Sequence, residues 1–381
     1  MKNKISVLLI LSILILSACG QNTVVNDNTP ASGQKAQRYK IGVMGPYTGD
    51  AASVGLPIQA AIKIAIDEVN SKGGINGVML EPIYEDSKCN PKDGNAAAQK
   101  LVNVDQVKII IGGVCSGETL GAAPITEAAK VILISPSATS PDITKAGDFV
   151  FRVAPSDAYA GTVASNYASG KLKAQKAAVI SESTDYAQGL SRVFKEQFSK
   201  AGKIVADEVY NPEDTDFRTQ VTKVKASQPD VVYLVPQTPL KGVLLVKQLK
   251  EAGIKTQLLT AEVLVGRDVV KENSKDMEGM IGIEQTVDKN AKSDALFAKY
   301  KKDAGQDPPF PGYMAGGYDT VYLISDAINK GGYDSGKIRD YLYAVKNYDG
   351  AVGKLTIDQN GDPILGYTIE QVKNGQIVPL G

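Results

Sequence analysis

Short runs of β-branched and aliphatic residues recur along this chain, and each is followed by a segment with helical periodicity. The clearest runs are KIIIG at 108–112, VILIS at 131–135, AAVIS at 177–181 and VVYLV at 231–235. None of them alternates apolar with polar residues, as a strand with one solvated face would. Such strands, separated by helices, are typical of a parallel sheet that helices cover on both faces. The fold class is therefore predicted to be α/β.

The alternating pattern runs twice through the chain. A first series begins at 39–44 and includes a helix at 54–70, on which Ile58, Ile62 and Ile66 share one face. A second series begins after the segment FRVAPSDAYAG at 151–161. The body of the chain is also longer than one average domain. We therefore expect two doubly wound lobes, each with its own parallel sheet.

Composition excludes several classes of function. The chain has 42 basic and 42 acidic residues, so no field for nucleic acid or anionic lipid is indicated. It has no histidine, which excludes a Ser-His-Asp triad and a histidine zinc site. No segment fits G-x-x-x-x-G-K-[ST], and no G-x-G-x-x-G opens the first helix, so nucleotide binding has no support. We expect no enzyme, no metal site and no cofactor.

The loops after three of the predicted strands are rich in Gly, Ser and Thr. They lie at 113–119, 136–141 and 182–186. In a doubly wound sheet, ligands bind beyond the carboxyl ends of the strands, where such loops meet. Hydroxyl groups and free backbone N–H groups at helix N-termini suit an anion such as a carboxylate. For any single loop the alternative is helix capping by Ser, Thr or Asp. One chemistry repeated in three equivalent loops favours a binding site.

The first residues have the layout of an export signal. Lys2 and Lys4 precede the apolar stretch 5–16, which is too short to span a membrane as a helix. The stretch ends in LSAC, which resembles the lipobox of prokaryotic lipoproteins. The resemblance implies that residues 1–18 are a signal peptide and that Cys19 is acylated. The alternative is an ordinary secretory signal with an incidental cysteine.

Segment 19–38 is polar and has few apolar residues. Such a segment cannot bury enough surface to order itself, so we expect a flexible tether that spans roughly 25 Å. Signal, lipid and tether together predict an extracytoplasmic protein, on the cell surface or in the periplasm, that meets the membrane only through its lipid.

Two cysteines, Cys89 and Cys115, remain once Cys19 is set aside. An exported protein meets an oxidising environment, which favours a disulfide between two such residues. Two free buried thiols are the alternative.

From about residue 39 to its C-terminus, the chain resembles the type I periplasmic binding proteins of branched-chain amino-acid transporters. The resemblance rests on the segments IDEVNSKGGINGVMLEPIYEDSKCNPKDG, IIGGVCSG, LISPSATSPDIT and PEDTDF. It implies a two-lobed, monomeric receptor that closes on an amino acid and delivers it to the permease of an ABC transporter. It also implies that Cys89 and Cys115 form a disulfide.

Receptors of this family cross between their lobes three times. By the resemblance, the crossovers lie near Ser156, Gln285 and Leu365. The resulting boundaries are 39–156 plus 285–365 for lobe 1, and 157–284 plus 366–381 for lobe 2.

The resemblance also implies ligand-binding roles. Ser116 matches the serine that holds the ligand carboxylate, and Thr139 matches the threonine that contacts both carboxylate and ammonium. Ser137, next to Ala138, stands where a backbone carbonyl accepts from the ammonium. Glu262 matches the acid that pairs with this ammonium.

Three further positions are expected to form walls of the site. Tyr186 matches an aromatic wall of the second lobe, for which packing without ligand contact is the alternative. Tyr313 falls where leucine-type members have an aromatic residue against the ligand side chain. Gln237 departs from the family, which usually has a tyrosine there, and an amide makes the pocket more polar. The expected ligand is an aliphatic, branched-chain or small polar amino acid.

Two other receptors would share this pattern. One binds a neutral amide or urea, but a buried Glu262 without a cationic partner would then be costly. The other signals instead of transporting, and its binding half would look the same. Neighbouring permease and ATPase genes would distinguish a transport role from a signalling role.

Replacing Cys19 by alanine tests the predicted anchor. In a host that processes lipoproteins, the wild-type chain should partition into the detergent phase, because an acyl chain contributes about 0.8 kcal/mol per buried CH₂. The Cys19→Ala variant should partition into the aqueous phase. A variant that stays with the membrane fraction would show that Cys19 is not the anchor.

Overall fold

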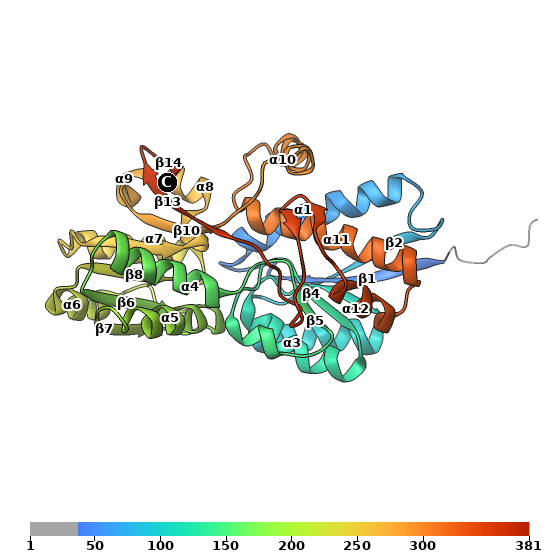
Figure 1. Ribbon diagram of the computed structural model, residues 1–381, viewed down its shortest axis with the longest axis horizontal. Coiled ribbons are helices and arrows are strands. Elements are labelled where there is room, and N and C mark those ends of the chain that lie inside the picture. The colour runs from blue at the N-terminus through green and yellow to red at the C-terminus, as the bar shows by residue number, and fades with distance from the viewer. Residues whose placement is uncertain (1–36, 381) are drawn as a thin grey trace, which may run out of the picture. The chain divides into compact units, whose positions relative to one another are not determined.

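Residues 37–380 are described by the structure, a computed structural model shown in Figure 1. The first of its two large sheets has five parallel strands in the order β2-β1-β3-β4-β5. The strands are β1 (Arg38–Gly45), β2 (Met79–Asp86), β3 (Ile109–Ile111), β4 (Ile132–Ser135) and β5 (Val150–Arg152). The predicted parallel sheet is confirmed.

The second sheet has seven strands in the order β14-β13-β10-β9-β8-β6-β7. They are β6 (Lys176–Glu182), β7 (Lys203–Tyr210), β8 (Val231–Val235), β9 (Gln257–Ala261), β10 (Ile281–Gln285), β13 (Tyr367–Lys373) and β14 (Gln376–Pro379). Strands β6 to β10 are parallel, whereas β13 and β14 add an antiparallel edge. A short hairpin of β11 (Tyr348–Gly350) and β12 (Gly353–Leu355) stands apart from both sheets.

Helices cover both sheets. Those that belong to the first are α1 (Ala52–Ser71), α2 (Pro91–Gln99), α3 (Ser116–Ala129), α10 (Ala291–Ala304), α11 (Pro311–Gly331) and α12 (Ser335–Tyr343). Those of the second are α4 (Asp157–Asn166), α5 (Asp185–Phe198), α6 (Arg218–Ser227), α7 (Pro239–Glu251), α8 (Arg267–Glu272) and α9 (Ser274–Met277). Short helical turns are η1 (Lys100–Val104), η2 (Pro141–Lys145), η3 (Tyr167–Lys171) and η4 (Glu262–Val265).

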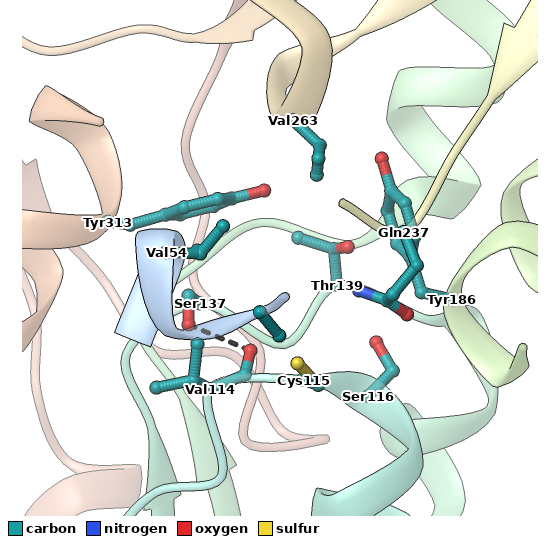
Figure 2. Close-up of a pocket in the computed structure, with 11 residues that line it drawn as sticks. Val54, Val114, Cys115, Ser116, Ser137, Thr139, Tyr186, Gln237, Val263 and Tyr313 are labelled. Atoms are coloured by element: carbon teal, nitrogen blue, oxygen red, sulfur yellow. Dashed lines mark hydrogen bonds between the residues drawn. The ribbon is translucent and has the colours of Figure 1, made fainter. Parts of the chain in front are cut away.

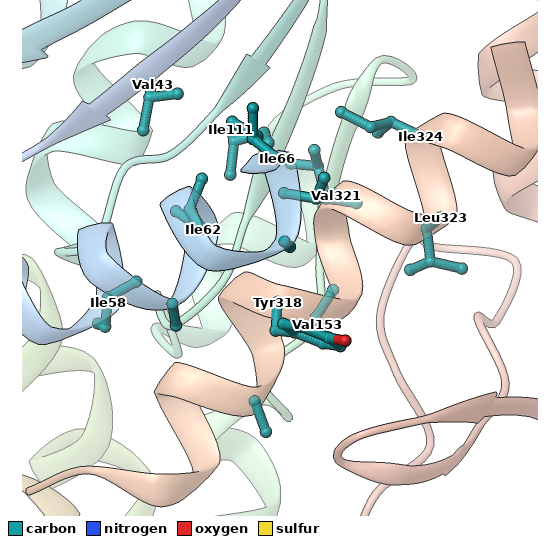
Figure 3. Close-up of a cluster of buried hydrophobic side chains, with 14 of the residues drawn as sticks. Val43, Ile58, Ile62, Ile66, Ile111, Val153, Tyr318, Val321, Leu323 and Ile324 are labelled. Atoms are coloured by element: carbon teal, nitrogen blue, oxygen red, sulfur yellow. The ribbon is translucent and has the colours of Figure 1, made fainter. Parts of the chain in front are cut away.

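Successive strand residues point to opposite sides of a sheet. Since successive residues of β3, β4 and β5 are all buried, both faces of the first sheet are covered. Val43 and Ile111 belong to one core with a stripe of α1 and with α11, and Figure 3 draws side chains of this core, among them Ile62 and Val321. On the other face, Met44, Ile110 and Leu133 pack against α2 and α3. Each fully buried aliphatic side chain of this kind contributes about 1.5–3 kcal/mol, so the uninterrupted apolar runs explain the two helix layers. The second sheet is buried on both faces in the same way.

The chain passes between the two sheets three times. It leaves the first sheet after β5, returns to the first hydrophobic core after β10, and re-enters the second sheet at β13. The predicted fold class, two doubly wound α/β lobes joined by three crossovers, is confirmed. The lobe boundaries given above remain predictions.

Several elements differ from the expectation. Residues 95–102, which their sequence predicts as a helix, lie within a longer helical segment made of α2 and η1, whose start the Asn90 side chain caps by accepting from the Asp93 N–H. Helix α11 begins at Pro311 and not near Tyr318, since proline suits a first turn. Strand β5, helix α4 and strand β10 were not predicted, and the two β-like runs expected at the end are four short strands.

Signal peptide, Cys19 and nearly all of the predicted tether lie outside the described residues, so the anchor stays a prediction. Within residues 37–380, no helix combines the length and the apolar character that a membrane span requires.

A disulfide joins Cys89 and Cys115, as predicted. Cys89 follows β2 and Cys115 is the N-cap of α3, so the bond connects the loops after two strands of the first sheet. Both N–H groups also donate to the buried Glu118 carboxylate, at 3.1 Å and 2.8 Å. Burial raises the pKa of Glu118 to about 7, and these hydrogen bonds oppose the shift. The bond and the carboxylate together fix the start of α3.

Reduction of the disulfide should lower the melting temperature. The two cysteines are 26 residues apart, and freeing a loop of that length in the unfolded chain corresponds to about 3–4 kcal/mol. Thermal unfolding with and without reductant measures the change. The double variant Cys89→Ser/Cys115→Ser provides the same comparison without a reductant. Equal stability of the oxidised, reduced and double-substituted proteins would contradict a stabilising role of the disulfide.

Candidate functional site

The carboxyl ends of the strands define the candidate site. In each sheet the first strand of the series lies between the second and the third: β1 lies between β2 and β3, and β6 between β7 and β8. The connections on either side of such a point run to opposite faces and leave a crevice, where ligands of doubly wound folds bind. The loops after β3, β4, β6 and β8 begin there.

A small pocket of about 20 Å³ lies among these loops (Figure 2). Its lining comes from loops that follow strands of both sheets and from the N-termini of α1, α3, α5 and α11: Ala51, Val54, Val114, Cys115, Ser116, Ser137, Thr139, Tyr186, Gln237, Val263 and Tyr313. In Figure 2, Val54 and Tyr313 lie on one side of the pocket, and Ser116 and Gln237 lie on the other. The pocket therefore has an apolar and a polar end.

The N-terminus of α3 forms part of the polar end. Ser116 is the first residue of this 14-residue helix, whose dipole favours an anion at that position. The Ser116 hydroxyl accepts from the Ser140 N–H at 3.1 Å, which ties the loop after β4 to the helix. In the same loop Ser135 accepts the Ala138 N–H at 2.8 Å. No protein acceptor for the neighbouring Thr139 N–H is present in the described part of the chain. This end can hold a carboxylate.

Two buried acids lie beside the pocket. Glu262 is 1% exposed, and neither of its carboxylate oxygens has a hydrogen-bond partner in the described residues. Asp157 is also buried; its Oδ2 accepts from the Thr139 hydroxyl at 2.8 Å, whereas its Oδ1 is unpartnered. Burial raises the pKa of both carboxyls, and the Glu262 charge raises the pKa of Asp157 further. The Tyr313 hydroxyl opposes the Glu262 shift only in part, since it does not reach hydrogen-bond geometry. A ligand cation here would pair with charges that the protein leaves uncompensated.

Gln237 enters the pocket from the loop after β8. Its backbone N–H donates to Glu182 at 2.8 Å, and Glu182 also accepts from the Tyr210 hydroxyl at 3.2 Å. These bonds fix the Gln237 backbone while the side-chain amide lines the pocket. The amide therefore presents both a donor and an acceptor to a ligand.

Contacts between the two sets of helices surround the pocket. Arg192 of α5 pairs with Asp142 of η2 at 2.7 Å, and Lys241 of α7 lies 4.0 Å from Asp50. At Gly189 a Cβ atom would lie only 2.9 Å from the Ser140 hydroxyl, so a glycine is needed for α5 to come this close. The Arg192–Asp142 pair is exposed, and such pairs contribute about 1 kcal/mol at most.

Six of the eight residues predicted to bind ligand line one pocket: Ser116, Ser137, Thr139, Tyr186, Gln237 and Tyr313. Glu262 directly precedes the lining residue Val263, and Ala138 is buried without lining the pocket. Contact with a ligand stays a prediction for all eight.

The sequence analysis missed Asp157 and the apolar lining at Ala51, Val54 and Val263. Asp157 lies in the segment FRVAPSDAYAG, where its position directly after a predicted crossover was the only signal. No group of three or more His, Cys, Asp or Glu side chains between residues 37 and 380 is arranged to hold a metal ion.

A family model described as periplasmic binding protein matches residues 38–376. The chain belongs to the periplasmic binding protein family. The predicted resemblance to its type I members of branched-chain amino-acid transporters is confirmed.

Relatives include the leucine-, isoleucine-, valine-, threonine- and alanine-binding protein of Pseudomonas aeruginosa, which is 32% identical over 86% of this chain and 87% of its own length. LivJ of Streptococcus pneumoniae, a branched-chain amino-acid transporter substrate-binding protein solved with isoleucine, superposes with a TM-score of 0.82 at 29% identity, over 90% of this chain and 99% of its own. A solute-binding protein of Rhodopseudomonas palustris, solved with 3,4-dihydroxybenzoic acid, has a TM-score of 0.80 at 25% identity, over 90% and 96% of the two chains. The family thus includes receptors for ligands with and without an ammonium group.

Replacing Glu262 by glutamine should stabilise the unliganded protein at alkaline pH. A carboxyl whose pKa is raised by folding favours the folded state only while it is protonated, so stability falls as pH rises through the folded pKa. Removing the charge should recover about 1–3 kcal/mol at pH 8 and little at pH 5. Denaturant unfolding at both pH values measures this.

Glu251→Gln is the matched control, because Glu251 is exposed on α7. It should leave the stability at both pH values unchanged. A Glu262→Gln protein that is less stable than the wild type at pH 8 would contradict the argument.

Proposed function

We propose that this protein is a lipid-anchored extracytoplasmic receptor that binds one α-amino acid and delivers it to an ABC transporter. The observation that carries the proposal is the pair of opposite polar features at one pocket. The N-terminus of α3 with Ser116 and the free Thr139 N–H suits a carboxylate, and the unpartnered Glu262 suits an ammonium. An α-amino acid carries both groups on one carbon.

Asp157 adds to this assignment. It accepts the Thr139 hydroxyl proton and so orients this hydroxyl, while its second oxygen remains unpartnered. Two nearby carboxylates repel each other when both are charged, and an ammonium bound beside them offsets this repulsion. This favours a cationic group in the ligand over the neutral amide or urea considered from the sequence.

The ligand side chain is expected to be small and mostly aliphatic. Val54, Val114, Val263 and Tyr313 provide an apolar wall, and the pocket between them is small. Gln237 presents an amide to the pocket from the side opposite Val54 and Tyr313, which favours a small or hydroxyl-bearing side chain over leucine. The amino-acid ligands named for the relatives support this class.

Delivery to a transporter is supported by the family and by the transporter protein named among the solved relatives. The anchor is supported by the lipobox-like LSAC before the tether. A sensory role would use the same pocket, and neighbouring permease and ATPase genes would favour transport over it.

A calorimetric panel of ligands tests the pocket. Leucine, isoleucine, valine, alanine and threonine are titrated into the wild type, together with 4-methylpentanoate, isoamylamine and benzoate. Only molecules with both an α-carboxylate and an α-ammonium should bind. At a hundredfold excess over its Kd, a bound amino acid should stabilise the fold by about 2.7 kcal/mol.

Glu262→Ala should weaken amino-acid binding by about 2–5 kcal/mol, because it unpairs the ligand ammonium. This is a loss of about thirtyfold to several thousandfold in affinity. Gln237→Leu should shift preference toward leucine and isoleucine by about 1–3 kcal/mol. The exposed-site variant Glu251→Gln should bind like the wild type. Binding of benzoate or 4-methylpentanoate in place of amino acids, or undiminished binding by Glu262→Ala, would refute the assignment.

A further inference from the structure

Glu262 and Asp157 form a pair of buried acids from two separate elements. Glu262 begins η4 directly after β9, and Asp157 is the first residue of α4. Helix α4 packs against β9, since Ala160 and Ala261 belong to one buried core. The two carboxyl groups are close enough for the Glu262 charge to act on Asp157. Both therefore meet a ligand cation at the same end of the pocket, next to Thr139.

The protein leaves this pair without a counter-charge. Among residues 37–380, neither acid has a lysine or arginine nitrogen within 4.0 Å. The Arg152 charge acts on Asp157 only from further away, because its guanidinium donates to Asp362 at 2.6 Å and 2.8 Å. Two ionised carboxylates here would be desolvated and would also repel each other.

The other titratable groups that face the pair come from five elements. They are Tyr186 of α5, Tyr233 of β8, Tyr313 of α11, Tyr367 of β13 and Glu284 of β10. Burial raises the pKa of every one of these tyrosines well above its ordinary value, so their hydroxyls stay neutral. Burial raises the pKa of Glu284 as well, and its ionisation would only add negative charge. A bound proton is then the means by which the unliganded pair can be neutralised.

A proton and a ligand ammonium therefore have the same role at these acids. Burial raises the pKa of Glu262 to about 7, and burial together with the Glu262 charge raises the pKa of Asp157. At pH 6 the unliganded pair thus holds a proton. An ammonium beside a carboxyl favours the ionised form and lowers its pKa. The proton is then expelled as the ammonium binds.

We propose that amino-acid binding in this pocket is a proton exchange, in which the ligand ammonium displaces a proton from the Glu262–Asp157 pair. This inference rests on the proposed function. One carboxyl O–H bond breaks, its proton passes to the buffer, and the resulting carboxylate accepts an N–H of the ammonium. The free amino acid keeps its carboxylate and its ammonium between pH 5 and pH 8, so the exchanged proton comes from the protein.

The exchange makes affinity depend on pH with a definite sign. Protons compete with the ligand below the pKa of the pair, so affinity falls as the pH falls, by about tenfold for each pH unit while one proton is displaced. Above that pKa the pair is already ionised, and affinity levels off. The receptor therefore holds its ligand at neutral and alkaline pH and releases it in acid.

Threonine and leucine are the probes, and each is titrated calorimetrically into the purified full chain at pH 5, 6, 7 and 8. The tighter of the two should lose about tenfold in affinity for each pH unit below 7 and much less between pH 8 and pH 7. Titrations at pH 6 in two buffers of different ionisation enthalpy count the protons. About one proton should leave per bound ligand at pH 6, and almost none at pH 8.

Asp157→Asn and Glu262→Gln test the source of the proton. Each removes one of the two repelling charges, so the fall in affinity should begin at a lower pH, and proton release at pH 6 should drop to about half or less. Asp157→Asn is the milder change, because an asparagine oxygen can still accept from the Thr139 hydroxyl. Glu251→Gln should keep the pH profile and the proton release of the wild type.

Thermal unfolding at each pH establishes that the proteins are folded, and the wild-type titrations decide the proposal even where a variant is not. Wild-type affinity that changes less than about twofold between pH 5 and pH 8, or a binding heat that is independent of the buffer at pH 6, would overturn it and leave the proposed function standing. Equal proton release by the wild type and both variants would also overturn it. Absence of amino-acid binding at every pH would instead refute the proposed function, and this inference with it.

Discussion

Successive residues of β1 face opposite sides of the first sheet, and both sides are buried. Ile41 and Val43 pack in the core formed with α1 and α11, and Met44 packs with α2 and α3. Such a strand tolerates no polar side chain along its length, so polar residues can enter only at its ends. Because helices cover both faces, the connections on either side of this first strand run to opposite faces of the sheet. The site lies where this alternation opens the structure, at the carboxyl ends of the strands.

The loops at those ends are fixed from behind by buried carboxylates whose hydrogen bonds are satisfied. Glu118 accepts from the backbone on both sides of the disulfide, and Glu182 holds the Gln237 backbone. Glu262 and Asp157 differ from these two, because three of their four carboxylate oxygens have no partner. We expect this difference to separate acids that stabilise the fold from acids that pair with a bound cation. Stability lost at the second pair is the expected cost of an affinity for cations.

Strand β10 also carries polar groups without partners. Glu284 and Glu370 face one another's charge without an ion pair, and Gln285 is buried with an unsatisfied amide. Strand β10 also pairs with β9, which leads directly to Glu262. Among the described residues, Gln285 thus joins Glu262 and Asp157 as a buried polar side chain without a partner, whereas the unpartnered Tyr233 hydroxyl lies within the core of the second sheet.

The sequence by itself determined the α/β class, the twofold series of strands and helices, and the pairing of Cys89 with Cys115. It could do so because double-sided burial requires uninterrupted apolar runs, and because only two cysteines were available once Cys19 was assigned to the anchor. The family resemblance picked out the six predicted residues that line the pocket; five of them come soon after such runs, and Tyr313 does not. The positions of Asp157, Val54 and Glu284 were decided only by the tertiary structure. Asp157 follows a crossover and no apolar run marks it, Val54 reaches the pocket from the first turn of α1, and the strand of Glu284 joins that of Glu370 through an antiparallel pairing of segments more than eighty residues apart. Contacts of this kind depend on how distant strands register, and no local pattern in the chain encodes that register.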